Sequence, residues 1–437
     1  MIPLPPKPVR RHAPAAIVAL ALALALACTA CGRPESSHMP SSAVTVPPVS
    51  ARAAKVYRNA VVIDTHNDLP SRMLDDGYDA DVRHQPGYGK TKGDTDLPRL
   101  VESGITAQFL SAFIDAKYPL VKPGQSWVRV EAYMDTIHAF VDRHPDSLIF
   151  ATNSDDVRRA KKEGKVAIFI GVEGGHAIEN SLDKLRQLYA QGARYMTLTW
   201  NNGNDWAGSS IGVNGTSTAG LTDFGKDVVR EMNRLGMLVD ISHVSDSTFY
   251  DVIATSKDPV IASHSSSRAL GGHPRNMTDD MLRAVARNDG VVDVNFNAPF
   301  IDPTFAAAED SVRKTTAAEA EAAMRQPGAD TAKLRSAYDS LTNQRIHALP
   351  RPPLSVLLDH IDHIVQVAGV DHVGLGSDFD GVDGLLPADM LDVTYLPNIA
   401  QGLIDRGYTD TDITKILGGN MLRVIEIVLD RQPSGKP

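Results

Sequence analysis

The chain has 437 residues, of which 43% are hydrophobic and 22% charged, which is typical of a globular protein with one large core or two ordinary ones. A formal net charge of -9 and the lack of a basic patch argue against a nucleic-acid partner. Both cysteines lie within the first 31 residues, so the rest of the chain has no thiol for a disulfide or a metal site. Any metal must therefore be held by His, Asp and Glu.

The first 31 residues are typical of a bacterial export signal. Three basic residues between positions 7 and 11 precede an apolar run over 15–27, which is too short to serve well as a permanent membrane anchor. The run ends in ACTACG, which is similar to a bacterial lipobox and would make Cys31 the lipidated residue and new N-terminus. Because Cys28 stands where a large aliphatic residue is usual, ordinary cleavage after an Ala-Leu-Ala segment is the alternative.

Residues 32–52 are rich in Pro and Ser and weakly apolar, which predicts a flexible tether. Signal and tether together predict an exported protein of the bacterial cell envelope, held at the periplasmic or outer face of a membrane by an N-terminal lipid anchor. We expect the folded domain over residues 53–432.

Short β-branched or apolar runs alternate with helical stretches along this domain. Several of the helical stretches, such as DVVREMNRLG, end in a Gly before the next strand. Repeated alternation of strand and helix predicts a parallel sheet, and eight such units fit a (β/α)8 barrel. The predicted strands are 61–66, 105–113, 166–174, 194–200, 237–243, 259–264, 291–296 and 372–379.

The domain is longer than a typical barrel, and residues 297–371 form a long excursion between the last two predicted strands. Its part TTAAEAEAAMRQ should be helical, and the excursion could serve as a lid, a dimer contact or a solvated helical insert. A doubly wound open sheet is the alternative architecture. It is disfavoured because no Gly-rich phosphate turn follows the first strand.

Ionisable side chains recur where the predicted strands end, and the active site of such a barrel is built at the carboxyl ends of its strands. A lone histidine or carboxylate there would more often be an ordinary hydrogen-bonded residue, but six from five strands should converge. Residues two apart on a strand point to the same side, so His66 and Asp68 can bind one cation together. The six are His66, Asp68, Glu173, His243, His264 and Asp378.

Three histidines and two carboxylates without a cysteine suit a borderline divalent metal, of which zinc is the commonest in such sites. Five ligands exceed what a single catalytic zinc needs, so two metal ions are expected. Glu173 would bridge them at a separation of about 3.5 to 4 Å. Asp378 would then be available as a general base and acid.

The chain resembles the membrane (renal) dipeptidases, the zinc peptidases of family M19, over residues 58 to about 428. The resemblance rests on the ordered motifs DTHNDLP, GVEGGHAIEN, DISHVSDSTFYDV, PVIASHSSSRAL, HPRNMTDDML and HVGLGSDFDGV. It implies a barrel of the metal-dependent amidohydrolase type, two zinc ions, and hydrolysis of dipeptides that include those with a D-residue at the C-terminal side. It also makes a homodimer a reasonable expectation.

The resemblance further implies roles for single residues. One zinc would be held by His66, Asp68 and Glu173, and the other by Glu173, His243 and His264. Asp378 would be the acid and base. Arg275, in HPRN, falls where the family has an arginine for the substrate carboxylate, an anion that a guanidinium fork matches well.

One position departs from the family pattern. Mammalian members have a histidine after the motif RYMTLT that is thought to steady the tetrahedral intermediate, whereas this sequence has Trp200. Tryptophan donates one N–H and cannot become a cation. Asn201, Asn202 or Asn204 could supply the missing donor, although a loop rich in Asn and Gly is equally typical of a turn. We therefore name Trp200 and Asn201 as candidate substrate-binding residues.

Two other functions compete with a dipeptidase. The same barrel and metals could act on a lactone, a different amide or a modified dipeptide, because a fold does not choose a substrate. The chain could also be a non-catalytic envelope lipoprotein, although such a protein would have no chemical reason to keep the full ligand set. Activity on a small substrate panel and metal content separate these alternatives.

Overall fold

The computed structural model describes residues 49–121, 124–213 and 216–431. The predicted export signal, Cys31 and most of the predicted tether lie outside these residues. Helix α1 (Ala51–Asn59) begins where the Ser50 hydroxyl accepts a hydrogen bond of 3.1 Å from the Ala53 N–H, which satisfies a free amide of the first turn. The last two residues of the predicted tether, 51 and 52, are therefore helical.

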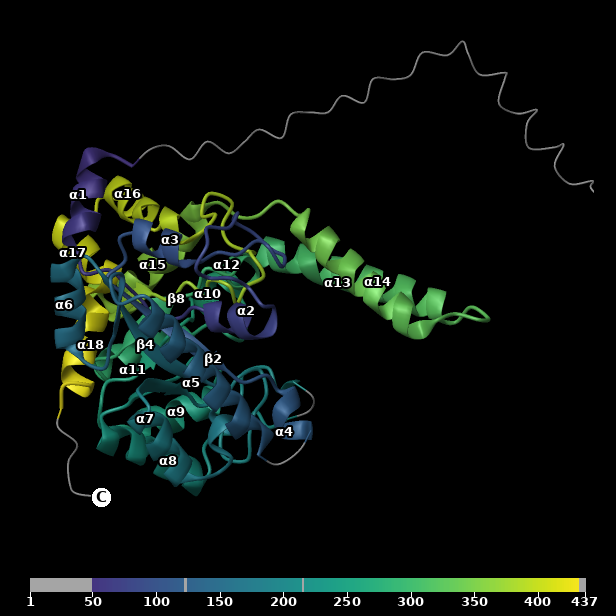
Figure 1. The fold of residues 1–437 in the computed structure, drawn as a ribbon, viewed down its shortest axis with the longest axis horizontal. Helices are drawn as coiled ribbons and strands as arrows, with labels where there is room; N and C mark the ends of the chain where they lie inside the picture. Colours follow the sequence, from purple (N-terminus) through teal and green to yellow (C-terminus); the bar gives the residue numbers. More distant parts are fainter. Residues whose placement is uncertain (1–48, 122–123, 214–215, 432–437) are drawn as a thin grey trace, which may run out of the picture. The chain divides into compact units, whose positions relative to one another are not determined.

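Eight parallel strands form a closed ring, which confirms the predicted (β/α)8 barrel (Figure 1). β1 pairs with β2 and with β9, and β2 pairs with β4, so the ring runs β1, β2, β4, β5, β6, β7, β8, β9 and back to β1. The strands are β1 (Ile63–Asp64), β2 (Ala107–Phe113), β4 (Val166–Glu173), β5 (Ala193–Thr197), β6 (Leu238–Asp240), β7 (Ile261–Ala262), β8 (Val291–Val294) and β9 (Val373–Leu375).

Each strand of the ring overlaps one of the eight predicted runs. Most strands are shorter than predicted, because the polar residues at their carboxyl ends leave the ladder and form loops. A further strand, β3 (Leu148–Phe150), pairs with the first three residues of β4 and takes no place in the ring. It was not predicted.

Helices surround the ring, and α6 (Ser154–Glu163) shows how the sequence sets their ends. Asn153 caps its first turn, and Gly164 ends it with a φ of 69°, a conformation that suits glycine. The other helices of the barrel are α2 (Leu69–Asp75), α3 (Leu97–Glu102), α4 (Lys117–Val121), α5 (Gln125–Arg143), α7 (Leu182–Ala190), α8 (Asp223–Leu235), α9 (Asp246–Thr255), α10 (Arg268–Gly271), α11 (Asp279–Arg287), α15 (Leu354–Ala368), α16 (Pro397–Asp405), α17 (Asp410–Thr414) and α18 (Asn420–Val428).

Alternate strand residues belong to two different apolar clusters. Phe109, Phe169 and Tyr195 belong to one cluster, in which the two phenylalanine rings stack at 4.5 Å. Their neighbours Leu110 and Ile170 belong to the larger cluster, which includes most of the helices. Because successive strand residues face opposite sides, the first cluster fills the barrel and the second lies between ring and helices.

The long excursion forms three helices before the barrel helix α15. They are α12 (Ala298–Ile301), α13 (Pro303–Met324) and α14 (Thr331–His347). α13 covers the stretch predicted to be helical, and it lies beside α14 (Figure 1). Phe305 and Ile346 form a small apolar cluster with Ala298 and Leu385, which fixes the base of the pair. A role of the excursion as a lid or a dimer contact stays a prediction.

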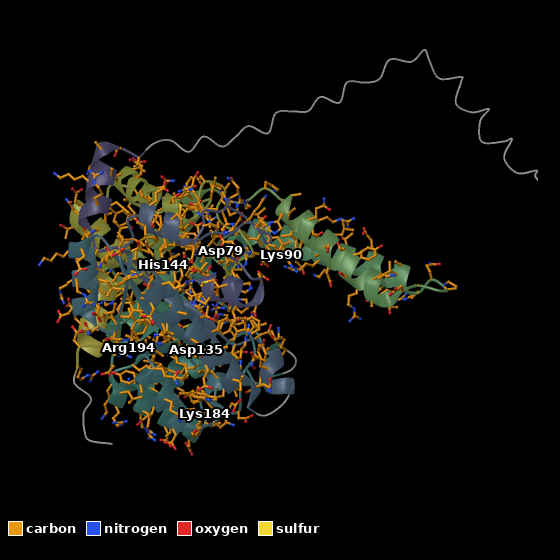
Figure 2. All side chains as sticks on the ribbon, viewed as in Figure 1. Asp79, Lys90, Asp135, His144, Lys184 and Arg194 are labelled. Atoms are coloured by element: carbon orange, nitrogen blue, oxygen red, sulfur yellow. The ribbon has the colours of Figure 1, made fainter. Side chains whose placement is uncertain are left out.

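Charged residues stand on the outer surface of the barrel. Asp135 on α5 and Lys90 in the loop before α3 are both exposed (Figure 2). At the end of α5, His144 Nε2 lies 2.9 Å from Asp81 Oδ1. Within the described ranges, no helix is long and apolar enough to cross a membrane.

Candidate metal centre and active site

The six predicted ionisable residues lie together at the carboxyl ends of their strands. Glu173 is the last residue of β4, and the other five follow β1, β6, β7 and β9 within a few residues. All six are at least nine-tenths buried. His66, Glu173 and His264 form one group whose ligand atoms lie within 4.8 Å of one another, and His66, Asp68 and Asp378 form a second.

Glu173 stands between the histidines. Its Oε2 lies 3.4 Å from His66 Nε2, whereas its Oε1 lies 2.9 Å from His243 Nε2 and 3.7 Å from His264 Nε2. The hydroxyl of Ser111 donates a hydrogen bond of 3.2 Å to Oε2 and helps to orient the carboxylate. The two oxygens of Glu173 therefore face different sets of nitrogens, as a bridging carboxylate would.

Asp68 and Asp378 complete the side of the cluster that contains His66. Asp68 Oδ2 lies 3.3 Å from His66 Nε2, and Asp378 Oδ1 lies 4.0 Å from the same atom. The Asp68 N–H donates to the carbonyl of Phe379 at 2.8 Å, which ties the loop after β1 to the loop after β9. The first and last strands of the ring thus bring these carboxylates to one imidazole.

Each histidine is held through its other ring nitrogen by a different neighbour. His66 Nδ1 lies 2.8 Å from the Tyr195 hydroxyl. The Tyr195 ring passes over Gly171, where a Cβ would lie only 1.9 Å from the ring. His243 Nδ1 lies 3.1 Å from Asn201 Oδ1. His264 Nδ1 lies 2.7 Å from Ser263 Oγ. These contacts aim all three Nε2 atoms at Glu173.

The histidines beside Glu173 Oε1 are neutral. Burial, helped by the charge of Arg275, lowers the pKa of His243 to about 3. Burial also lowers the pKa of His264 well below its ordinary value. The neutral imidazole is the form that ligates metals.

Negative charge surrounds His66. Burial would lower the pKa of His66, but Tyr195, Glu173 and Asp68 raise it well above its ordinary value. Burial would likewise raise the pKa of Glu173, but His66 and His243 outweigh it and hold that pKa below its ordinary range. The pocket at His66 Nε2 therefore favours a cation.

Several features of the cluster fit metal ions. An amide oxygen only accepts, so Asn201 places the proton of His243 on Nδ1 and turns an unprotonated Nε2 toward His264 Nε2, which is 2.9 Å away. Two such nitrogens need a cation or a proton between them. Among the described residues, His66 Nε2 and Asp68 Oδ1 have no hydrogen-bond partner. Ligand atoms around a tetrahedral zinc lie about 3.3 Å apart, close to the separations at His66.

A cavity of about 320 Å³ opens over the cluster. Trp200 and Asn201 line it, and the rings of Trp200 and Phe113 form a T-shaped pair with centroids 4.8 Å apart. Arg275 also lines it, although its side chain is buried. Among the described residues, the guanidinium donates only to the Ser265 hydroxyl at 3.4 Å and the His264 carbonyl at 3.2 Å.

Two residues of the site have a left-handed backbone. His243 has a φ of 67° and Asp378 a φ of 62°, which is rare for residues with a Cβ. Such conformations cost of order 1–3 kcal/mol and cluster at functional sites, where the surrounding structure maintains them. The strain marks both positions as built for their side-chain direction.

Sequence reasoning missed the residues that hold the site residues in place. Tyr195 holds His66, Ser263 holds His264, and Asn295 donates a hydrogen bond of 2.8 Å to Asp378 Oδ2. Asn295 had a usable signal, because it stands near the end of the seventh predicted strand. Tyr195 had none, since it lies 129 residues from His66 along the chain.

A closed parallel barrel with histidines and carboxylates converging at the carboxyl ends of its strands has the architecture of a metal-dependent hydrolase. The family model for membrane dipeptidase, peptidase family M19, matches residues 50–434. The chain therefore belongs to the membrane dipeptidase family, M19, whose members are metallopeptidases, as the resemblance predicted.

Solved structures agree with this assignment. The probable dipeptidase PvdM of Pseudomonas aeruginosa is 26% identical, with a TM-score of 0.74 over 87% of this chain and 98% of that one. Dipeptidase AC, a metallopeptidase of family M19, is 24% identical, with a TM-score of 0.68 over 85% and 99%. A metallopeptidase of Rhodobacter sphaeroides, bound to a phosphinate mimic of L-Ala-D-Ala, is 23% identical, with a TM-score of 0.67 over 84% and 99%. The last two similarities show the fold.

Proposed function

We propose that this chain is a zinc-dependent dipeptidase that hydrolyses dipeptides, including those with a D-residue at the C-terminal side. The observation that supports this most is the position of Arg275. Its buried guanidinium has no ion pair with a carboxylate in the described part of the chain, yet it faces the cavity that contains Glu173. A buried cation that has no anion in contact is costly, so the cavity suits an anionic ligand.

The free carboxylate of a short peptide meets this need. Burial lowers the pKa of Arg275 to about 10, which still leaves it charged at neutral pH. Its fork would bind a C-terminal carboxylate and place the preceding peptide bond near Glu173. The cavity, at about 320 Å³, lies at the lower end of the range for ligand sites and favours a small substrate.

Two zinc ions would be held by residues that share Glu173. His66, Asp68 and Glu173 would hold one ion, and Glu173, His243 and His264 the other. When bound, the ions supply Lewis acidity for the peptide carbonyl and lower the pKa of water enough to make it a nucleophile near neutral pH. Neighbouring side chains aim Nε2 of each histidine at the site, and His243 and His264 are neutral there.

Asp378 would move the proton. The pKa of Asp378 is raised to about 7, mainly by burial. The charges of Asp68 and Glu173 raise the pKa further, whereas His66 and the hydrogen bond from Asn295 lower it. A general base is most effective with a pKa near the working pH. Asp378 would accept a proton from the attacking water and give it to the leaving amine, while Asn295 holds its second oxygen.

A substrate panel tests this function against its alternatives. The panel comprises L-Ala-L-Ala, L-Ala-D-Ala, the amide of L-Ala-L-Ala, trialanine and a simple lactone. We expect rapid release of alanine from both dipeptides and at least about 100-fold slower cleavage of the amide, which lacks the carboxylate that Arg275 would bind. Preferred cleavage of the lactone would favour a related metallohydrolase, and no turnover by metal-loaded protein would favour a non-catalytic lipoprotein.

The inclusion of substrates with a C-terminal D-residue draws on the Rhodobacter sphaeroides metallopeptidase, which has the same fold and holds a mimic of L-Ala-D-Ala. We also propose export to the cell envelope with a lipid on Cys31, on the sequence pattern alone. Mass spectrometry of the N-terminal peptide from membrane fractions tests it. A free N-terminus that begins before or after Cys31 without lipid would contradict the anchor.

A further inference from the structure

A buried carboxylate lies one hydroxyl away from a ligand histidine. Ser263 Oγ lies 2.6 Å from Asp240 Oδ2 and 2.7 Å from His264 Nδ1. Asp240 ends β6 and Ser263 follows β7, the next strand of the ring. Neither Asp240 nor Ser263 is exposed to solvent. This chain of three side chains lies inside the barrel and belongs to no step described above.

Asp240 is fixed in place by hydrogen-bond donors. The backbone N–H groups of Ser242 and Ser263 donate to its Oδ1 at 3.0 and 2.9 Å. The hydroxyl of Thr197 donates to its Oδ2, beside that of Ser263. The carboxylate is therefore an acceptor at every contact and cannot turn away from Ser263.

Asp240, Ser263 and His264 form a hydrogen-bonded relay. The direction of the hydrogen bonds in this relay determines which nitrogen of His264 is free to bind metal. Ser263 has one hydroxyl proton, and the carboxylate of Asp240 only accepts, so that proton points to Asp240. The oxygen of Ser263 then accepts the proton of His264 Nδ1. Nε2 of His264 is left with its lone pair and faces Glu173 Oε1.

We propose that Asp240 and Ser263 are positioning residues that set the affinity of the metal site formed by Glu173, His243 and His264. This inference rests on the proposed two-metal function. The relay fixes the His264 tautomer. It also brings a third negative charge, that of Asp240, toward two divalent ions whose direct ligands Asp68 and Glu173 supply only two negative charges. Partners of this kind behind a ligand histidine change metal affinity by about 10- to 100-fold.

Two substitutions act on the relay in different ways. Ser263→Ala removes the acceptor for His264 Nδ1 and leaves the tautomer unrestrained. Asp240→Asn is more severe, because its new NH₂ would donate to Ser263 Oγ, whose hydroxyl proton would then turn to His264 Nδ1. That arrangement requires the imidazole proton on Nε2, the atom that faces the metal site.

The test is equilibrium dialysis of the chelator-treated protein against zinc alone at buffered free concentrations, with bound zinc measured by elemental analysis. We expect two equivalents in the unmodified protein. Ser263→Ala should weaken one equivalent about 10-fold and Asp240→Asn about 100-fold, while the other equivalent is unchanged. Thermal melting without metal shows whether each variant folds. If one variant does not fold, the zinc affinity of the other is enough to test the relay.

Asp293→Asn is the matched control. Asp293 is a buried carboxyl on β8, next to β7 in the ring, and among the described residues neither of its oxygens has a hydrogen-bond partner. Its zinc affinities should match those of the unmodified protein. Unchanged affinity in both relay variants, or an equal loss in Asp293→Asn, would overturn the relay alone. Fewer than two zinc ions in the unmodified protein would overturn the proposed function and the relay with it.

Discussion

The side-chain amide of Asn295 donates a hydrogen bond of 2.8 Å to Oδ2 of Asp378. The direction of the amide is fixed, because Asn295 Oδ1 accepts the backbone N–H of Asn297 at 2.6 Å. The bond favours the charged form of Asp378 and opposes burial, and the net pKa of Asp378 is raised to about 7. Asn295 therefore influences the pH at which Asp378 becomes a base.

Substitution of Asn295 by Leu should move the pH profile. Loss of the donor raises the pKa of Asp378, so the acid limb of kcat/KM should shift to higher pH by about one unit. Steady-state kinetics between pH 5 and 9 measure this shift. Asn297→Ala keeps the backbone N–H that orients Asn295, so its acid limb should stay in place. An unshifted limb in Asn295→Leu would argue against Asp378 as the base.

Arg275→Met should weaken use of substrates that have a free C-terminal carboxylate. We expect kcat/KM for L-Ala-L-Ala to fall at least about 100-fold, mainly through KM, because two charge-assisted hydrogen bonds are lost. The already slow amide of L-Ala-L-Ala should be little affected. Arg268→Met is the control, since Arg268 is paired with Asp246 at 2.7 Å outside the cavity. Equal losses for dipeptide and amide would contradict carboxylate binding by Arg275.

Trp200→His should raise activity on simple dipeptides. A protonated imidazole can stabilise an oxyanion more strongly than an indole N–H, and the family histidine is thought to act there. We expect kcat/KM on L-Ala-L-Ala to increase by about tenfold or more. The substitution also removes the edge contact with Phe113, so thermal melting should be measured alongside. An unchanged or lower kcat/KM would show that this position has no oxyanion role.

Asp293→Asn should stabilise the protein at neutral pH. Burial, helped by the charges of Asp240 and Asp64, raises the pKa of Asp293 well above its ordinary value. Between the unfolded pKa of about 3.9 and the higher folded pKa, the native state binds the extra proton, so the acid costs stability as pH rises. The variant should melt about 2 °C or more higher at pH 7.5, and less so at pH 5. A lower melting temperature at both pH values would contradict a neutral, unpartnered acid.

The barrel and the convergence of its ionisable side chains could be predicted because both depend on local patterns. Each strand of the ring is a β-branched or apolar run, and the carboxyl ends of parallel strands must meet on one face. His66, Glu173, His243 and His264 could therefore be placed together. Strand β3 (Leu148–Phe150) was missed because three apolar residues before a helix have no distinct period.

The supporting contacts could not be read from spacing. Tyr195 reaches His66 across the barrel interior, and Asn201, named as a substrate contact, lies against His243 at 3.1 Å while also lining the cavity. Such pairs depend on how distant strands are placed in three dimensions. Ser263 is adjacent to His264, but its role depends on Asp240, which only the fold brings near.

The most direct test of the account is release of alanine from L-Ala-L-Ala by the domain that begins near Ser50, with bound metal counted in the same sample before and after chelation. We expect activity to disappear as about two metal equivalents are removed and to return when zinc is added back. Undiminished hydrolysis by metal-free protein, or a protein with two zinc ions that cleaves neither L-Ala-L-Ala nor L-Ala-D-Ala, would contradict it.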